Sequence, residues 1–139
     1  MKAINDAIKL KVDETTGGVH NTFYTAIGGR FYFVDAPQSV VFPYSVYHSI
    51  DELQDWSFGS GPSKRTNVTI QIDCLSETRG ATEIESIRTA LISLFEYKTV
   101  ILSVTSFTFI YMKFVGATGP EKIDGIWNYN ARYEIEVEE

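Results

Sequence analysis

The chain has 139 residues, of which 44% are hydrophobic and 22% charged, and its formal net charge is −6. This length and composition predict one globular domain over residues 1–139 and exclude a disordered tail. The acidic balance disfavours binding to nucleic-acid phosphates, and no apolar run reaches the length of a bilayer. The single cysteine, Cys74, leaves no intramolecular disulfide and fits a reducing cytoplasm.

The first third of the chain predicts two short helices and a strand. Apolar residues recur every three or four positions over residues 2–12, which predicts an amphipathic helix. Asn21 is placed to cap a second short helix, which the pair Gly28 and Gly29 ends. Residues 30–35 are aromatic and β-branched and predict a strand, and two prolines make residues 36–43 a loop.

A long antiparallel hairpin is predicted next. Residues 44–56 alternate imperfectly between polar and apolar, and residues 68–74 alternate strictly, which is typical of half-buried strands. Small, turn-forming residues fill the segment 57–63 between them. We therefore expect the two strands to pair across a hairpin tip.

The segment over residues 80–96 predicts the longest helix of the chain. Ile84, Ile87 and Leu91 are spaced to form one apolar stripe that faces a sheet. Thr82 and Glu85 have the spacing of a capping box at its first turn.

The last third predicts two strands around a second long hairpin loop. Residues 100–115 are rich in β-branched and aromatic residues, with a bulge or bend near Ser106, and Gly and Pro make residues 116–125 the loop. Residues 127–137 alternate most clearly, with the apolar side chains on odd positions and the polar ones on even positions. The predicted fold class is α+β, with a mainly antiparallel or mixed sheet, the long helix on one face and the N-terminal helix nearby.

Residues that could carry catalysis are scarce. His20 and His48 each lack a second histidine, cysteine or carboxylate at ligand spacing, so we predict no catalytic, cofactor-binding or metal-binding residues and no cofactor. The glycine-rich segment before Lys64 lacks the spacing of a phosphate loop. One alternative is a small α+β enzyme or ligand-binding protein with an acidic pocket formed by Asp51, Asp55 and Asp73.

Several short motifs occur in a characteristic order. They are Arg30-Phe31-Tyr32, Ala36-Pro37-Gln38, Pro43-Tyr44 and Gln71-Ile72-Asp73-Cys74, followed by the helix. In order and spacing, over residues 1–137, the chain resembles the tail-completion or tail-terminator proteins of long-tailed bacteriophages. The resemblance implies a non-enzymatic virion protein at the head–tail interface, made in the bacterial cytoplasm. Another head–tail connector or a minor tail protein is the nearest alternative.

The resemblance also implies partners. Proteins of this family form rings, commonly hexamers, that contact the tail tube protein and a head-completion or connector protein while DNA passes nearby, with no membrane involved. We expect the two hairpin tips to carry the protein contacts. The candidates at these tips are Trp56, Phe58, Lys64, Arg65, Glu121 and Lys122.

An acidic row in the last predicted strand has two interpretations. Glu134, Glu136 and Glu138 share one face of that strand. Charges on an outer strand face or edge discourage unwanted pairing with other sheets. The resemblance offers the second interpretation, a negative wall that faces the DNA passage and repels the duplex.

Overall fold

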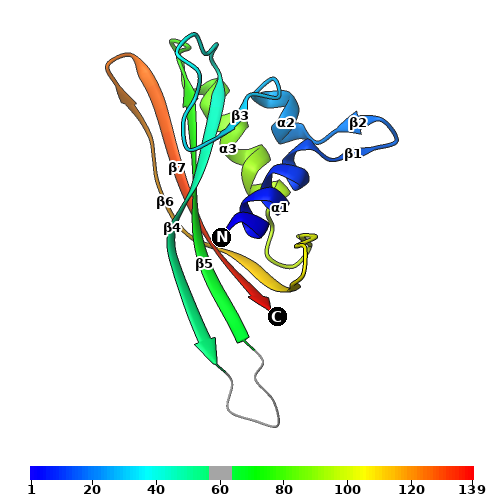
Figure 1. Cartoon of the computed structure of the whole chain (residues 1–139). Helices are drawn as coiled ribbons and strands as arrows, with labels where there is room; N and C mark the ends of the chain where they lie inside the picture. Colours follow the sequence, from blue (N-terminus) through cyan, green and yellow to red (C-terminus); the bar gives the residue numbers. More distant parts are fainter. Residues whose placement is uncertain (57–63) are drawn as a thin grey trace.

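The computed structural model describes residues 1–56 and 64–139, with the backbone alone for Asp55 and Trp56, and confirms the predicted α+β class (Figure 1). In chain order the elements are α1 (Lys2–Asp13), β1 (Thr15–Thr16), β2 (Val19–His20), α2 (Thr22–Ala26), β3 (Phe31–Phe33), β4 (Tyr44–Trp56), β5 (Lys64–Ser76), α3 (Thr82–Leu94), β6 (Thr108–Ile123) and β7 (Ile126–Glu138). The short hairpin formed by β1 and β2 was not predicted.

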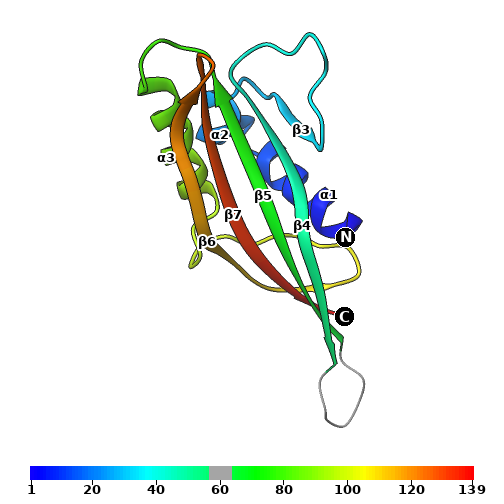
Figure 2. The same ribbon diagram turned by 90° about the vertical axis from the view of Figure 1, so that its left-hand side faces the viewer.

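Five strands form one sheet in the order β3-β4-β5-β7-β6. Strand β3 is parallel to β4, and the other neighbours are antiparallel. The three helices lie on one face of this sheet, and the opposite face, called the free face below, carries no helix (Figures 1 and 2). The antiparallel pairing of β4 with β5 confirms the predicted long hairpin.

The core lies between the sheet and the helices. Every second residue of β5 from Thr66 to Ser76 is buried, and so is every second residue of β7 from Tyr129 to Val137. Helix α1 buries Ile4, Ala7, Ile8 and Val12 against them, and helix α3 buries Ile84, Ile87, Ala90 and Leu91. The alternation and the helical stripes read from the sequence thus place the correct faces inward.

The predicted capping box of α3 is wrong. Ala81 is the N-cap residue and makes no side-chain cap hydrogen bond. The first turn is tied to the sheet instead, because the Ser76 hydroxyl at the end of β5 donates to Glu83 Oε1 at 2.6 Å. The first turn of α3 is thus held by a hydrogen bond to the end of β5, and not by a side-chain cap of its own.

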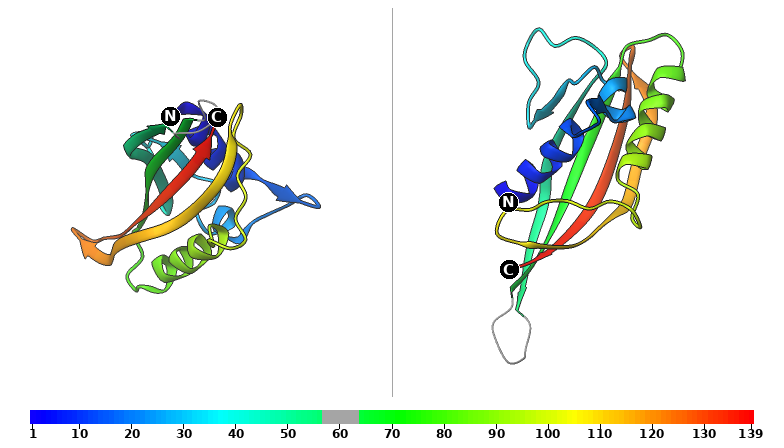
Figure 3. Two further views of the ribbon diagram at one scale, coloured as in Figure 1. Left: turned by 90° about the horizontal axis from the view of Figure 1, so that it is seen from below. Right: turned by 90° about the vertical axis from the view of Figure 1, so that its right-hand side faces the viewer.

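Residues 100–107 do not form the predicted strand. They cross the end of the core below the helices before the chain returns as β6 (Figure 3). Val100, Leu102 and Val104 are buried there, so their alternation reflects an extended segment that closes the core without joining the sheet. Ser106, with a φ of 68°, lies at the predicted bend.

The predicted loop over residues 116–125 is also wrong. Strand β6 continues to Ile123, and the connection to β7 is the two residues Asp124 and Gly125, with φ angles of 51° and 80°. Positive φ at both positions is typical of the tight turns that connect adjacent strands. The register of β6 against β7 shifts at three places, one of them between Thr118 and Glu121, so the strand accommodates Pro120 in an irregularity at the sheet edge.

Candidate assembly surfaces

The predicted interface residues lie at two opposite ends of the sheet. Lys64 and Arg65 begin β5 at the end where the long hairpin projects, and Glu121 and Lys122 lie at the end where β6 turns into β7 (Figure 1). The backbone of Trp56 ends β4 at the first of these ends. The side chain of Trp56 and all of Phe58 lie outside the described residues.

The base of the long hairpin is held by the last strand. The Arg65 guanidinium lies 3.9 Å from Glu138, and the backbone N–H of Glu139 donates to the carbonyl of Lys64 at 2.9 Å. Strand β7 therefore supports the base of the long hairpin.

The other two candidates are strand residues and not loop residues. Glu121 is exposed and pairs in register with Asn128. Lys122 lies over the ring of Trp127, with 5.7 Å from Nζ to the centroid, and donates to the carbonyl of Arg79 at 3.3 Å. Lys122 thus joins this end of the sheet to the segment before α3.

The three glutamates of the acidic row lie on the free face of β7, as the alternation predicts. Because β7 lies between β5 and β6, the row crosses the middle of the sheet, so it lies on an outer strand face and not at a sheet edge. Two of the three carboxylates have a cation nearby, Lys113 for Glu134 at 3.3 Å and Arg65 for Glu138 at 3.9 Å. The row is therefore less negative than its sequence implies.

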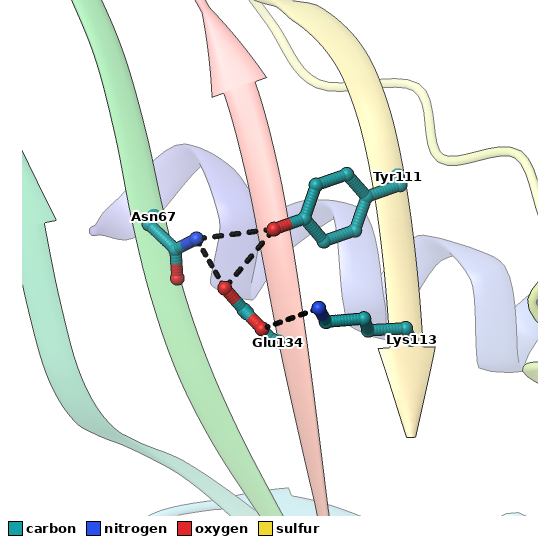
Figure 4. A network of polar contacts seen from close by, with 4 residues as sticks. All are labelled: Asn67, Tyr111, Lys113 and Glu134. Atoms are coloured by element: carbon teal, nitrogen blue, oxygen red, sulfur yellow. Dashed lines mark hydrogen bonds and ion pairs between the residues drawn. The ribbon is translucent and has the colours of Figure 1, made fainter. Parts of the chain in front are cut away.

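Glu134 is the centre of a polar network on this face (Figure 4). Its Oε1 accepts hydrogen bonds from the Asn67 amide and from the Tyr111 hydroxyl, the latter at 3.0 Å. The Asn67 bond, with help from Tyr111 and Lys113, lowers the pKa of the Glu134 carboxyl. Burial, reinforced by the bond to Glu134, raises the pKa of the Tyr111 hydroxyl to about 12. Strands β5, β6 and β7 are joined here through one ionised carboxylate.

An aromatic groove lies between α3 and β6 on the helix side of the sheet. Its volume is about 530 Å³. The lining residues that matter below are Arg88, Ile92, Glu96, Tyr97, Phe114 and Tyr133. We call it the α3–β6 groove. No pattern within α3 or β6 alone predicts it, because it arises only when the two elements pack side by side.

The walls of the α3–β6 groove are mainly aromatic and aliphatic, and they include the buried hydroxyl of Tyr133. Ile92, Tyr97 and Phe114 are exposed to 40%, 57% and 50% of their surfaces. Tyr133 is 1% exposed, and its hydroxyl finds no hydrogen-bond partner among the described residues. Buried hydroxyls are normally paired, so this one is an exception among the described residues.

The described residues do not assemble the predicted acidic pocket. Asp51 and Asp73 lie on the same free face but pair near Thr69 and Val46, about 13 Å apart along the strands. The side chain of Asp55 lies outside the described part of the chain. Asp73 instead lines an open pocket of about 640 Å³ together with Asp35.

Cys74 and His20 are both packed inside the fold or against a neighbouring ring. Burial raises the pKa of the Cys74 thiol to about 12, which disfavours the reactive thiolate. His20 is stacked on Tyr24 at 3.6 Å between ring centroids. Within residues 1–56 and 64–139 no three His, Cys, Asp or Glu side chains are grouped to hold a metal ion. None of the helices in that part of the chain has the length and apolarity to cross a membrane.

Comparison with known proteins gives structural matches only. No protein family and no curated protein matches the sequence. A chain of the virion of a native gene transfer agent particle matches the structure with a TM-score of 0.71 and 12% identity, covering 99% of this chain and 96% of that chain. A second solved chain, whose name states no function, matches with a TM-score of 0.56 and 9% identity, covering 99% and 93%. At these identities the matches show a shared fold.

Proposed function

We propose that this protein is a non-enzymatic structural component of a phage-type virion, which completes or terminates the tail and provides the surface that joins it to the head. The observation that carries the proposal is the match of nearly the whole chain to nearly the whole of a chain from a gene transfer agent virion. The motif order seen in the sequence supports the same assignment independently.

The surfaces fit a subunit that works by contact. The two ends of the sheet present different residues, the long hairpin at one and the β6–β7 turn at the other, so one end can face the tail tube protein and the other a head-completion or connector protein (Figure 1). The two lateral edges also differ, because β6 forms one edge and β3 with β4 the other. Unlike edges are what a ring requires, since each subunit meets its neighbour through two different patches.

We propose a ring, a hexamer by the family resemblance, at the head–tail interface of the virion, built from chains made in the bacterial cytoplasm. DNA passes through such a ring without specific binding. The free face, with Glu134, Glu136 and Glu138, is our candidate for the surface that lines the passage. Trp56, Phe58, Lys64 and Arg65 at the hairpin and Glu121 and Lys122 at the opposite end remain the candidates for contacts along the tail axis.

Electron microscopy of tails assembled with and without the protein tests the role. We expect tails of uncontrolled length, or tails that fail to join heads, when the protein is missing. Trp56→Glu, or deletion of residues 57–63, is expected to leave a folded subunit that no longer restores these tails. Normal tails and normal joining without the protein contradict the proposed role, and stabilisation of the fold by a metal ion or nucleotide in a thermal-shift screen favours the ligand-binding alternative.

A further inference from the structure

We propose that the α3–β6 groove is the receiving half of the contact between neighbouring subunits, and that it takes the corner formed by Phe33 and Val34 of a second copy of this chain. The inference rests on the proposed self-assembly and names the two patches that meet. It also assigns the unpaired Tyr133 hydroxyl a partner.

The Phe33–Val34 corner is apolar, exposed and held rigidly. Phe33 and Val34 are exposed to 50% and 52% of their surfaces at the end of β3. Val34 has a φ of 68°, and the N–H of Asp35 donates to the carbonyl of Phe33 at 2.8 Å, which makes a tight turn of three residues. The Val34 N–H donates in turn to the carbonyl of Tyr47 at 3.0 Å. A β-branched residue adopts this backbone rarely, so the fold holds two apolar side chains outward at a definite place.

The corner and the α3–β6 groove lie at the two ends of the same row across the sheet. Phe33 pairs with Tyr47, Tyr47 with Ile72, Ile72 with Ala131, and Ala131 with Ala117, which lines the groove. The register therefore places them at one height along the strands, and the strands that carry them, β3 and β6, form opposite lateral edges of the sheet (Figure 2). A rotation about an axis roughly parallel to the strands carries the corner of one subunit toward the groove of the next.

Both patches also lie on the same side of the sheet. Phe33 is in register with Tyr47, whose side chain is buried beneath the helices, and the two rings are 5.3 Å apart. Phe114 faces the same layer, because it pairs with the buried Tyr133 at 5.8 Å between ring centroids. Neighbouring sheets placed side by side in the same orientation bring the corner to the groove without turning either subunit over.

The chemistry of the two patches is complementary. The groove offers aromatic and aliphatic walls to Phe33 and Val34, and the Tyr133 hydroxyl can donate to a carbonyl of the entering corner. Asp35 is the one charged residue of the segment 33–43. The groove carries one charged residue of each sign, Arg88, which also pairs with Glu85 at 3.5 Å, and Glu96. The contact is heterologous, and its repetition generates a ring when the rotation between subunits closes.

Paired variants test the contact directly. Phe33→Glu removes the corner, and Ile92→Glu disrupts the groove; both side chains are exposed, so both variants should fold. We expect each variant alone to lose ring formation in native mass spectrometry and electron microscopy at high protein concentration. An equimolar mixture of the two should form dimers and nothing larger, because only one intact contact is then available. Val19→Glu, which changes another exposed apolar residue, is the matched control and should assemble like the wild type.

Cross-linking distinguishes failure of this contact from failure of assembly. The double variant Val34→Cys with Tyr97→Cys should give an oxidised ladder beyond the dimer, and each single variant no more than dimers. This contact is overturned if the wild type forms rings but the double cysteine variant gives no ladder, or if rings persist in Phe33→Glu. Either result leaves the proposed function standing. Wild-type chains that stay monomeric on tails and at high concentration, with no ladder, overturn both.

Discussion

Lys113 on β6 and Glu134 on β7 lie directly opposite each other on the free face, with 3.3 Å between Nζ and Oε2. Hydrogen bonds from Asn67 and Tyr111 reach the other carboxylate oxygen. The carboxylate therefore receives two neutral donors and one cation, and the contacts span three strands (Figure 4). This arrangement makes Glu134 a structural residue in addition to a candidate for the surface that lines the passage.

Removing this carboxylate should weaken the sheet. Glu134→Ala eliminates two hydrogen bonds and an ion pair on a side chain that is 25% exposed, and we expect the free energy of unfolding to fall by about 1–2 kcal/mol. Glu136→Ala, at the next outward position of the same strand, is the matched control and should change it by less than about 0.5 kcal/mol. Urea denaturation of the two variants and the wild type gives the comparison, and equal losses in both variants would contradict the role of the network.

The same network predicts a dependence on pH. The pKa of Glu134 is lowered in the folded state from its ordinary value of 4.5, so its contribution to stability is complete above that value. It is lost as the pH falls below 4.5 and through the folded-state pKa. We expect the stability difference between the wild type and Glu134→Gln to be constant from pH 7 to about 5.5 and to shrink at lower pH. Urea midpoints measured at several pH values test this, and a difference that grows on acidification would have the wrong sign.

The buried cysteine should be inert while the chain is folded. Cys74 is fully buried, and its thiol pKa is raised to about 12, chiefly by burial. We expect a water-soluble thiol reagent at pH 8 to label it only when the chain unfolds, at a rate that follows global unfolding in urea. Labelling within seconds in the absence of denaturant would show that β5 is more accessible than the structure implies.

The start of α3 can be tested with two neighbouring hydroxyls. Ser76→Ala removes the donor to Glu83 across the strand–helix junction and should cost about 1 kcal/mol of unfolding free energy. Thr82→Ala removes the residue expected to cap the helix from sequence, and it should cost much less, because α3 has no side-chain cap. Thermal or urea unfolding measures the loss of stability in each variant. A larger loss in Thr82→Ala than in Ser76→Ala would support the predicted capping box.

The variant Tyr133→Phe tests the stability of the subunit and the association of subunits separately. In the isolated subunit Tyr133→Phe removes a buried group without a hydrogen-bond partner, so we expect stability to be unchanged or raised by about 1 kcal/mol. If the proposed contact between subunits forms, the same change removes its Tyr133 donor and should weaken association. Urea unfolding of the monomer and the concentration dependence of ring formation measure the two effects. A variant that unfolds more easily as a monomer would indicate an internal partner for the hydroxyl.

The sequence predicts β5 and β7 well because both strands lie inside the sheet with one face buried throughout. Their alternation from Thr66 to Ser76 and from Tyr129 to Val137 reports that burial directly. Strand β6 lies at the edge, where Gly116 and Pro120 can be accommodated by irregular pairing. In the sequence alone these residues have the composition of a loop, which is why the second hairpin was placed wrongly.

The candidate surfaces also differ in whether the sequence predicts them. The acidic row could be predicted because a single strand carries it, and the alternation fixes its face. The α3–β6 groove could not, since Ile92 and Phe114 are 22 positions apart and become neighbours only through tertiary packing. The available signal was a surplus of apolar residues in α3 and β6 that the core does not need, and that signal does not tell which residues meet.

The order of the strands bears on how the protein is made. Strand β7 is translated after all the others yet lies between β5 and β6, and its Arg132 meets Gln71 at a separation of 61 residues. When a nascent chain has left the ribosome only as far as the β6–β7 turn, β3, β4 and β5 can pair with one another. Strand β6 then has no neighbour, because β7 is still missing. Chaperones that shield unpaired edges during synthesis should therefore matter most in the interval before the last strand emerges.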